Sequence, residues 1–193
     1  MTVYNQISEN KVKTFLIMFF FILIFSSFFF LLGKYFGSPW GYFFLGFFIS
    51  FASSVGSYFY GHKLVLMTTG AKIANKKTYF NFYTVTENLC LAAGLPMPKL
   101  YVINDPSPNA FATGRDPKHA VICVTTGLLE IMDRTELEGV IAHEMSHVKN
   151  FDILLASIVA VLVGTLALIS DLVIRNMLWG RGSNNDERGN RNP

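Results

Sequence analysis

Three long hydrophobic runs interrupt the polar sequence of this chain, and their lengths predict its membrane segments. The run from Thr14 to Leu32 has nineteen residues without a charge, and Trp40 to Tyr60 is a second run with aromatic residues at both ends. A helix of about 20 apolar residues crosses the roughly 30 Å hydrocarbon core of a bilayer, and Trp and Tyr favour its interfaces. We therefore predict transmembrane helices at 14–32 and 40–60, a short external loop at 33–39, and a third hydrophobic segment, also interpreted as transmembrane, at 153–174.

Small residues follow one side of the second run. Their spacing puts them near one helical face: Gly46, Ser50, Ser53, Ser54, Ser57 and Gly61. Small side chains let two helix backbones approach closely inside a membrane. This face is therefore predicted to pack against a neighbouring helix rather than to bind a ligand.

The distribution of Lys and Arg predicts the orientation of the chain. Residues 61–150 contain nine of them, whereas the first loop contains Lys34 alone. Because positively charged segments stay on the cytoplasmic side, we predict a multi-pass protein of the cell membrane whose N-terminus (1–13) and polar domain (61–152) face the cytoplasm. If the third segment crosses, the Arg-containing polar loop or tail at 175–193 lies outside, against this rule. The sequence leaves open whether 153–174 fully spans.

The polar region mixes helix and strand patterns. Residues 78–93 have a helical pattern that ends at Gly94, with two prolines beyond. Three segments are typical of strands: Lys99–Ile103, Asn109–Thr113 and His119–Thr125. Residues 126–132 are interpreted as a short helix, and 70–77 as a linker or a contact with the membrane surface. The mixture predicts an α+β domain with one small core.

Composition agrees with a membrane part joined to a modest polar part. The chain is 51% hydrophobic and 15% charged, with a mean hydropathy of +0.38, which is too apolar for an ordinary soluble domain. Fifteen of the nineteen Phe lie between Phe15 and Phe59. The net charge of +3 gives no reason to expect a nucleic-acid partner. Cys90 and Cys123 have no metal-binding spacing and are interpreted as core residues in a reduced compartment.

The pentapeptide from His143 to His147 (His-Glu-Met-Ser-His) is the strongest chemical signal. Two His four residues apart project from one face of a helix, so both imidazoles can reach one Zn²⁺ at roughly 2.0–2.1 Å. Glu144 follows the first His and can act as general base towards an activated water. The pattern therefore predicts a zinc site that hydrolyses peptide bonds.

The flanking sequence predicts the helix that this motif needs. Thr135 and Glu138 fit a capping box, and apolar residues then recur at helical spacing. The alternative interpretation is a polar helix face with two solvated His and a surface Glu. The other histidines, His62 and His119, have no partner in the motif and are interpreted as surface or structural residues.

Four segments together resemble the HtpX family of membrane zinc metalloproteases. They are Asn109-Ala-Phe-Ala-Thr-Gly114, Thr126-Gly-Leu-Leu129, the stretch from Glu136 to His147, and Asn150-Phe-Asp152. The likeness runs from about Leu91 to the end, and the two N-terminal segments agree in number and place. It implies a membrane-anchored, zincin-like domain with one Zn²⁺ per chain, which degrades misfolded or damaged membrane proteins in quality control and the stress response.

The resemblance also implies roles for individual residues. His143 and His147 would be the metal ligands and Glu144 the general base. By analogy with zincins, Asn109, Ala110 and Phe111 would belong to an edge strand to which a substrate backbone adds as a further strand; the alternative is a simple internal strand. Asp152 would accept a hydrogen bond from a ligand imidazole, or it is only a polar residue at the end of the metal helix.

One part of the family pattern has no counterpart in this sequence. A catalytic zinc needs three protein ligands and a water, and the family's third ligand is a Glu on a helix after a fourth hydrophobic segment. Asp171 lies twenty-four residues after His147, about 36 Å along a continuous helix, and cannot reach. Asp186 and Glu187 lie in a stretch rich in Gly, Asn and Arg. We therefore expect an N-terminal part of a longer protease that binds zinc weakly and cleaves little alone.

Two functions follow from these predictions. The first is a membrane-bound zinc endopeptidase with polypeptide or membrane-protein substrates. The alternative is a truncated, non-catalytic membrane protein of the same fold that binds partners or substrates.

Overall fold

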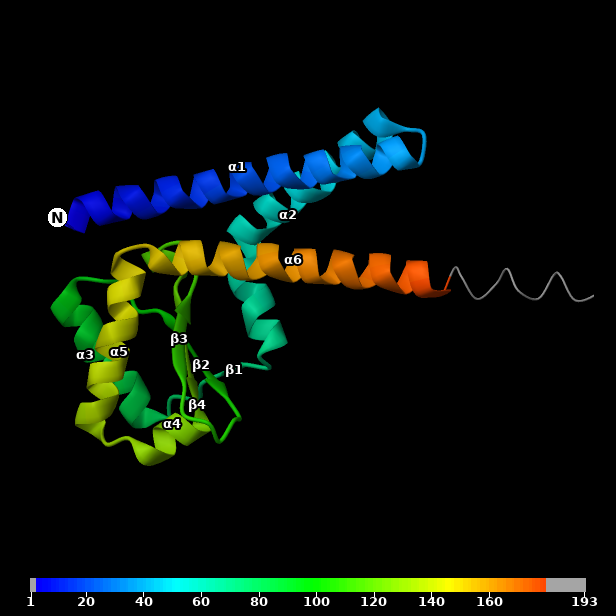
Figure 1. The fold of residues 1–193 in the computed structure, drawn as a ribbon. Helices are drawn as coiled ribbons and strands as arrows, with labels where there is room; N and C mark the ends of the chain where they lie inside the picture. The colour runs from blue at the N-terminus through cyan, green and yellow to red at the C-terminus, as the bar shows by residue number, and fades with distance from the viewer. Residues whose placement is uncertain (1–2, 180–193) are drawn as a thin grey trace, which may run out of the picture.

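The computed structural model describes residues 3–179. Its helices are α1 (Val3–Tyr35), α2 (Pro39–Thr68), α3 (Phe80–Ala93), α4 (Thr126–Ile131), α5 (Arg134–Lys149) and α6 (Asp152–Trp179), with one 3₁₀ turn at Pro117–His119 (Figure 1). Its strands are β1 (Lys72–Ile73), β2 (Lys99–Ile103), β3 (Ala110–Thr113) and β4 (Val121–Thr125). Most of the predicted polar tail, with Asp186 and Glu187, lies outside the described residues.

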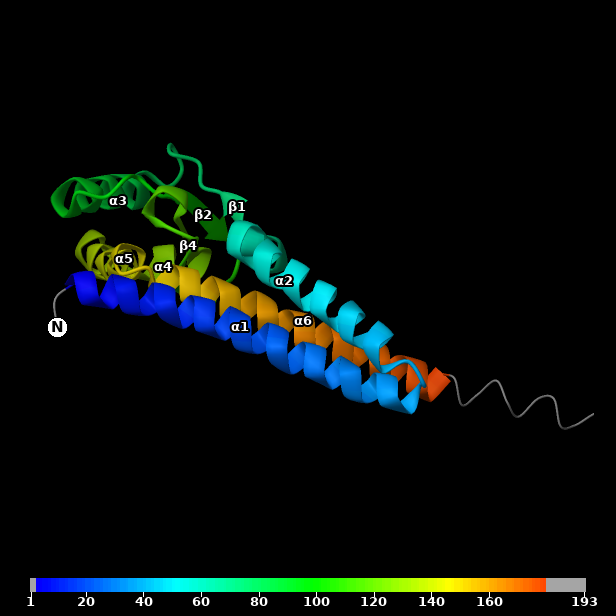
Figure 2. The ribbon, with the colours of Figure 1, turned by 90° about the horizontal axis from the view of Figure 1, so that it is seen from above.

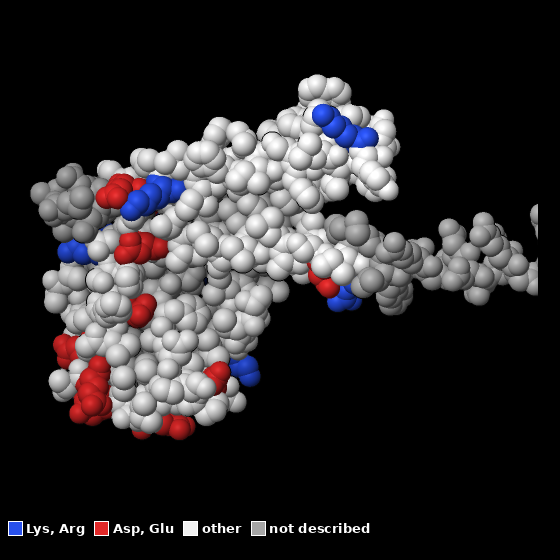
Figure 3. Space-filling model, viewed as in Figure 1, with Lys and Arg blue, Asp and Glu red and all other residues white. Residues whose placement is uncertain are grey.

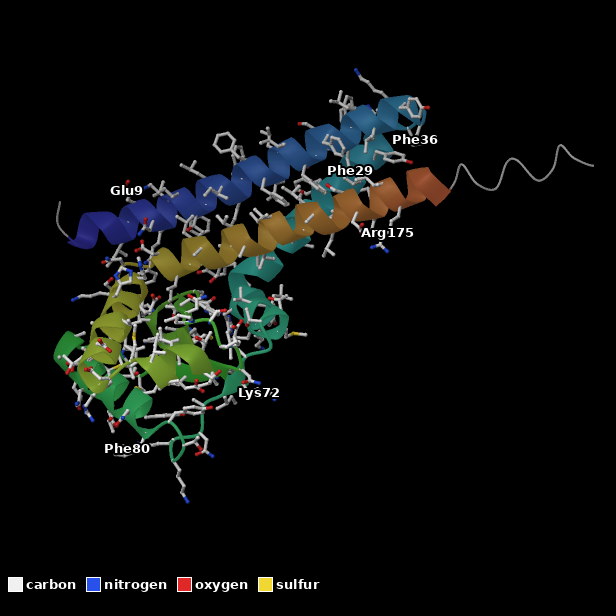
Figure 4. All side chains as sticks on the ribbon, turned by 60° about the horizontal axis from the view of Figure 1, so that its bottom comes forward. Glu9, Phe29, Phe36, Lys72, Phe80 and Arg175 are labelled. Atoms are coloured by element: carbon white, nitrogen blue, oxygen red, sulfur yellow. The ribbon has the colours of Figure 1, made fainter. Side chains whose placement is uncertain are left out.

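The long helices α1, α2 and α6 lie side by side (Figures 1 and 2). Within residues 3–179, three stretches are long and apolar enough to cross a membrane: Ile7–Tyr35, Pro39–Thr68 and Asp152–Leu172. Figure 3 shows no charged side chain along the middle of α1 and α6, whereas charges gather at the N-terminal end of α1 and over the smaller domain. In Figure 4, Phe36 marks the α1–α2 turn, far from the domain that carries Lys72 and Phe80.

The helices extend beyond the apolar runs that predicted them. The predicted cytoplasmic N-terminus is not a separate segment, because α1 continues through it; Glu9 and Lys13 form an ion pair one turn apart, at 2.7 Å, that suits a helix. Only residues 36–38 separate α1 from α2, and α2 continues to Thr68. At the other end, α6 runs to Trp179, past the predicted end at 174. Hydrophobicity locates the part of a helix that lies in lipid, not its ends.

The small-residue face of α2 packs against other helices, as predicted. Gly46, Ser50, Ser54, Ser57 and Gly61 are buried. A Cβ on Gly46 would lie 2.6 Å from the Cβ of Phe29 on α1, so only glycine allows this approach. Ser53 and Thr165 share a hydrogen bond of 2.9 Å between α2 and α6. This face therefore holds α2 between the two other long helices.

The sheet has the order β1-β2-β4-β3, with β2 parallel to β4 and the two outer pairs antiparallel. Together with the helices it confirms the α+β class. The sequence missed β1, because its two residues lie in the basic stretch interpreted as a linker. The predicted strand from His119 begins only at Val121, since Pro117 and Lys118 enter a 3₁₀ turn that includes His119.

Each face of the sheet packs against a different part of the chain. Ile122 and Val124 face α3 and α5 in the main core, whereas Val121 and Cys123 face Leu66 near the end of α2. Figure 1 shows α3 and α5 on one side of the sheet and the lower end of α2 on the other. Both cysteines are buried, as predicted, and burial raises the pKa of the Cys123 thiol to about 12.

A matched pair of glycine variants tests the packing of the domain. A Cβ on Gly127 would lie 2.0 Å from the Pro106 carbonyl oxygen, whereas a Cβ on Gly139 of α5 meets nothing within 4 Å. We expect Gly127→Ala to lower the free energy of unfolding by about 1–3 kcal/mol or more. Gly139→Ala should raise it by up to about 1 kcal/mol, because alanine favours helix. Thermal unfolding followed by circular dichroism measures both; equal effects would contradict this close contact.

Candidate metal and peptidase site

The helix that carries the pentapeptide begins at an acidic cap. Asp133 accepts hydrogen bonds from the amides of Thr135 (2.7 Å) and Glu136 (2.8 Å), and Glu136 accepts one from the Asp133 amide at 3.0 Å. The capping box is therefore Asp133 with Glu136, and the predicted box of Thr135 with Glu138 is wrong. The helix therefore begins at Arg134, directly after the Asp133 cap, and Thr135 lies inside its first turn.

The two histidines of α5 face one another. Their Nε2 atoms lie 3.3 Å apart and their ring centroids 4.8 Å apart. Two nitrogens that each bind a tetrahedral ion at 2.0–2.1 Å are roughly 3.4 Å apart. The separation in this structure therefore fits a shared zinc ion between His143 and His147.

The far side of the His147 ring is held by a carboxylate. Its Nδ1 lies 2.8 Å from an oxygen of Asp152, the first residue of α6. An acceptor on Nδ1 favours the tautomer whose proton is on that atom, and the lone pair of Nε2 is then free for a metal. Asp152 thus has the geometry expected of a group that orients a metal ligand.

The first long helix reaches the same carboxylate. Asn10 of α1 donates a very short hydrogen bond to the second oxygen of Asp152, and its amide also lies 3.0 Å from the carbonyl oxygen of Asn150. Next to it, the Lys11 ammonium lies 4.4 Å from the centre of the Phe151 ring. The N-terminal part of α1 therefore contacts every residue of the α5–α6 turn.

This turn has an unusual backbone conformation. Phe151 has a φ of +62°, in the left-handed backbone region that residues other than glycine rarely adopt. The conformation ends α5 at Asn150 and starts α6 two residues later. It is this reversal that brings Asp152 back to His147, five residues earlier in the chain.

The strand beside α5 is at the edge of the sheet. β3 pairs with β4 on one side only, and Ala112 packs in a small cluster with Val148 of α5. The Thr125 amide donates a backbone hydrogen bond to the carbonyl oxygen of Asn109. Because hydrogen-bonded pairs alternate along an antiparallel ladder, the backbone groups of Phe111 also point towards β4. The outward amides and carbonyls belong to Ala110 and Ala112. Sequence reasoning named the strand but missed Ala112, which strand alternation could have indicated.

The predicted residues therefore fall into two groups. His143, His147 and Asp152 come together at the end of α5, and Glu144 lies on the same helix with no hydrogen bond or ion pair of its carboxylate to another described residue. The Phe111 side chain instead packs on the opposite face of the sheet, in the cluster of Leu66. Among residues 3–179, no group of three or more His, Cys, Asp or Glu could hold a metal ion.

Comparison with known proteins decides the family. A "Protease HtpX homolog" of Tropheryma whipplei (strain Twist) is 45% identical over 178 residues, which are 92% of this chain and 60% of the relative. Proteins of the same name from Caldanaerobacter subterraneus and Streptococcus thermophilus are 45% and 38% identical, over 94% and 92% of the chain. The profile of peptidase family M48 matches residues 81–187, more than half of the chain. The chain belongs to peptidase family M48.

The M48 match and the similarity to these HtpX relatives confirm the resemblance found in the four sequence segments. The M48 match runs from α3 to beyond the end of α6 and includes the pentapeptide, the edge strand and Asp152. Asn10 lies before the matched residues, so no motif of the M48 match points to it. The chain spans about 60% of the length of these HtpX relatives.

His62 and His119 lie away from the two HtpX motif histidines. His119 is paired with Asp116 at 2.8 Å, and His62 follows the membrane part of α2. Both line a cavity beside the start of β2.

Proposed function

We propose that this protein is a membrane-bound, zinc-dependent endopeptidase that uses Glu144 as general base. The observation that carries the proposal is the facing pair of His143 and His147, with Asp152 behind one ring and an unpaired strand edge beside α5. Two histidines with only a structural role would need neither the Asp152 carboxylate nor a strand edge beside them. The names of the HtpX relatives support a protease as the general class.

The donor set suits zinc, and each residue has a task around it. His143 and His147 would hold the ion through Nε2, and a third ligand would come from outside residues 3–179. When bound, zinc would supply Lewis acidity towards water and the scissile carbonyl. Glu144 would take the proton of the attacking water and return it to the leaving amine.

The edge strand would supply the substrate site. An extended peptide can add to β3 through the outward backbone groups of Ala110 and Ala112, which is the usual form of strand addition. The metal helix ends where α6 enters the membrane, so such a peptide would lie close to the membrane surface. This position supports misfolded or damaged membrane proteins as substrates, and the nine Lys and Arg residues of 61–150 support a site that faces the cytoplasm.

Zinc content of purified variants tests the metal site. We expect His143→Ala and His147→Ala each to lose stoichiometric zinc, measured by elemental analysis of the protein from the intact gene in neutral detergent. Glu138→Gln, an exposed residue of the same helix, is the matched control and should keep its zinc. Unchanged zinc in both histidine variants would reject the proposed site.

A second function is favoured by one observation. Because no third ligand is found among residues 3–179, a non-catalytic protein of this fold could bind polypeptides along β3 without cleaving them. Such a protein would bind an unfolded polypeptide equally well after chelation of metal and would leave it intact. Cleavage that stops on chelation would reject this alternative.

A further inference from the structure

A basic cavity lies on the opposite face of the sheet from α5. It has a volume of about 200 Å³ and lies between the end of α2, the start of β2 and the 3₁₀ turn before β4. Its cationic or titratable lining residues are His62, Lys63, Lys99, Lys118 and His119. Its remaining lining is mostly apolar, from Leu66, Met97, Tyr101, Ala120 and Val121. Within residues 3–179 no carboxylate lines the cavity, so its described lining combines positive charge with an apolar wall.

The length of α2 leads us to expect the cavity at the level of the lipid headgroups. α2 has 30 residues and is about 45 Å long, so it extends well beyond a hydrocarbon core of about 30 Å. Gly61 packs against Ser157, about one turn into α6, and the exposed Tyr60 precedes it. His62 and Lys63 follow directly, where the helix leaves the apolar layer.

Two contacts hold the loop after β3 against the same part of α2 and α6. The guanidinium of Arg115, after β3, lies 5.5 Å from the centre of the Phe59 ring on α2. Gly114, next to it, donates a hydrogen bond of 3.3 Å to Ser157 of α6. The loop that carries Lys118 and His119 is therefore held against the membrane end of α2.

Three of the cations have no acidic partner among the described residues. Asp116 pairs with Arg115 and His119, but Lys63, Lys99 and Lys118 form no ion pair within residues 3–179. Lys63 instead lies 5.2 Å from the centre of the Tyr60 ring. Like charges that converge on one cavity repel each other, and an anion that binds there relieves this repulsion.

We propose that this cavity binds the phosphate of an anionic phospholipid. The ammonium groups of Lys63, Lys99 and Lys118 would surround the phosphate, and the glycerol and first methylene groups would lie against Leu66 and Met97. Basic cavities beside transmembrane helices suit such headgroups, and the membrane-level position favours lipid over a soluble anion. The site is separate from α5 and does not depend on proteolysis.

Native mass spectrometry of the purified chain in neutral detergent tests this site. With phosphatidylglycerol added, we expect one retained lipid per chain and weak retention of phosphatidylcholine. The triple variant Lys63→Gln, Lys99→Gln and Lys118→Gln should retain at least about tenfold less phosphatidylglycerol. The matched control Lys72→Gln, Lys76→Gln and Lys77→Gln removes the same charge elsewhere and should retain it normally.

Three results would overturn the proposal. They are equal retention of phosphatidylcholine, an equal loss in the control variant, and displacement of the lipid by millimolar inorganic phosphate, which would make the cavity a site for free anions. The single variant Lys99→Gln, checked for folding by circular dichroism, should show a smaller loss in the same direction. If the triple variant does not fold, normal retention in this single variant also counts against the site.

Discussion

Replacing Glu144 with Gln is expected to abolish peptide-bond cleavage while zinc stays bound. Gln keeps the size and shape of Glu but cannot accept a proton, and loss of general base catalysis lowers rates by about 10²–10⁴-fold. His143 and His147 are expected to keep their 3.3 Å separation, because among the described residues the Glu144 carboxylate forms no hydrogen bond or ion pair with either ring. Cleavage of an unfolded polypeptide, followed by gel or mass spectrometry, and zinc content measured on the same sample give both readouts.

The matched control for this experiment is Glu138→Gln. Glu138 lies on the same helix, is exposed and has the same change of charge. It should cleave at the normal rate. Retained cleavage in Glu144→Gln would remove Glu144 from the mechanism, whereas loss of zinc in that variant would show a structural effect instead of a catalytic one.

Replacing Asp152 with Ala is expected to weaken zinc binding by about 10–100-fold. The variant loses the acceptor that lies 2.8 Å from Nδ1 of His147, so the ring can turn and change tautomer. Competition with a zinc-chelating dye measures the affinity without any need for cleavage. Asp171→Asn is the control, because Asp171 is exposed on α6, like Asp152, and among the described residues pairs with Arg175 alone, at 2.8 Å. Unchanged affinity in Asp152→Ala would show that this hydrogen bond does not prepare the site.

The same zinc-affinity measurement on an Asn10 variant tests the contribution of α1. Its amide fixes the second oxygen of Asp152, so Asn10→Ala should weaken zinc binding in the same direction by about twofold to tenfold. If Asn10 acts through Asp152, the change should add nothing in a chain that already carries Asp152→Ala. Additive losses in the double variant would mean that Asn10 affects the metal by another route.

Local sequence patterns were enough to predict the helices and strands that depend on neighbouring residues. Lys99–Ile103 was predicted with its observed bounds, because a short run of alternating residues lies between prolines and a turn. The histidines of the pentapeptide were placed on one face by helical spacing alone. Where two local signals competed, the choice could fail: Asp133 with Glu136 and Thr135 with Glu138 have the same capping-box spacing, and the structure forms the first.

Features that depend on distant contacts could not be read from the sequence. β1 is two residues long and exists because it pairs with β2, which comes more than twenty residues later. In the sequence, nothing distinguishes Asn10 from any other polar residue before a hydrophobic run. Its role depends on the contact with Asp152 of α6, which only the folded chain forms. Phe111 was assigned to the substrate edge together with Ala110, but the pleat turns its side chain to the other face, towards Leu66.

The contact of Asn10 with Asp152 has a consequence for how the protein is made. The two residues are 142 positions apart, so Asn10 has left the ribosome long before Asp152 is synthesised. Translation of the histidine helix is therefore not sufficient to complete the surroundings of His147. They are complete only when the N-terminal end of α1 has packed against the start of α6. Packing of the first long helix against the third is therefore a step in forming the candidate site, and not only in anchoring it.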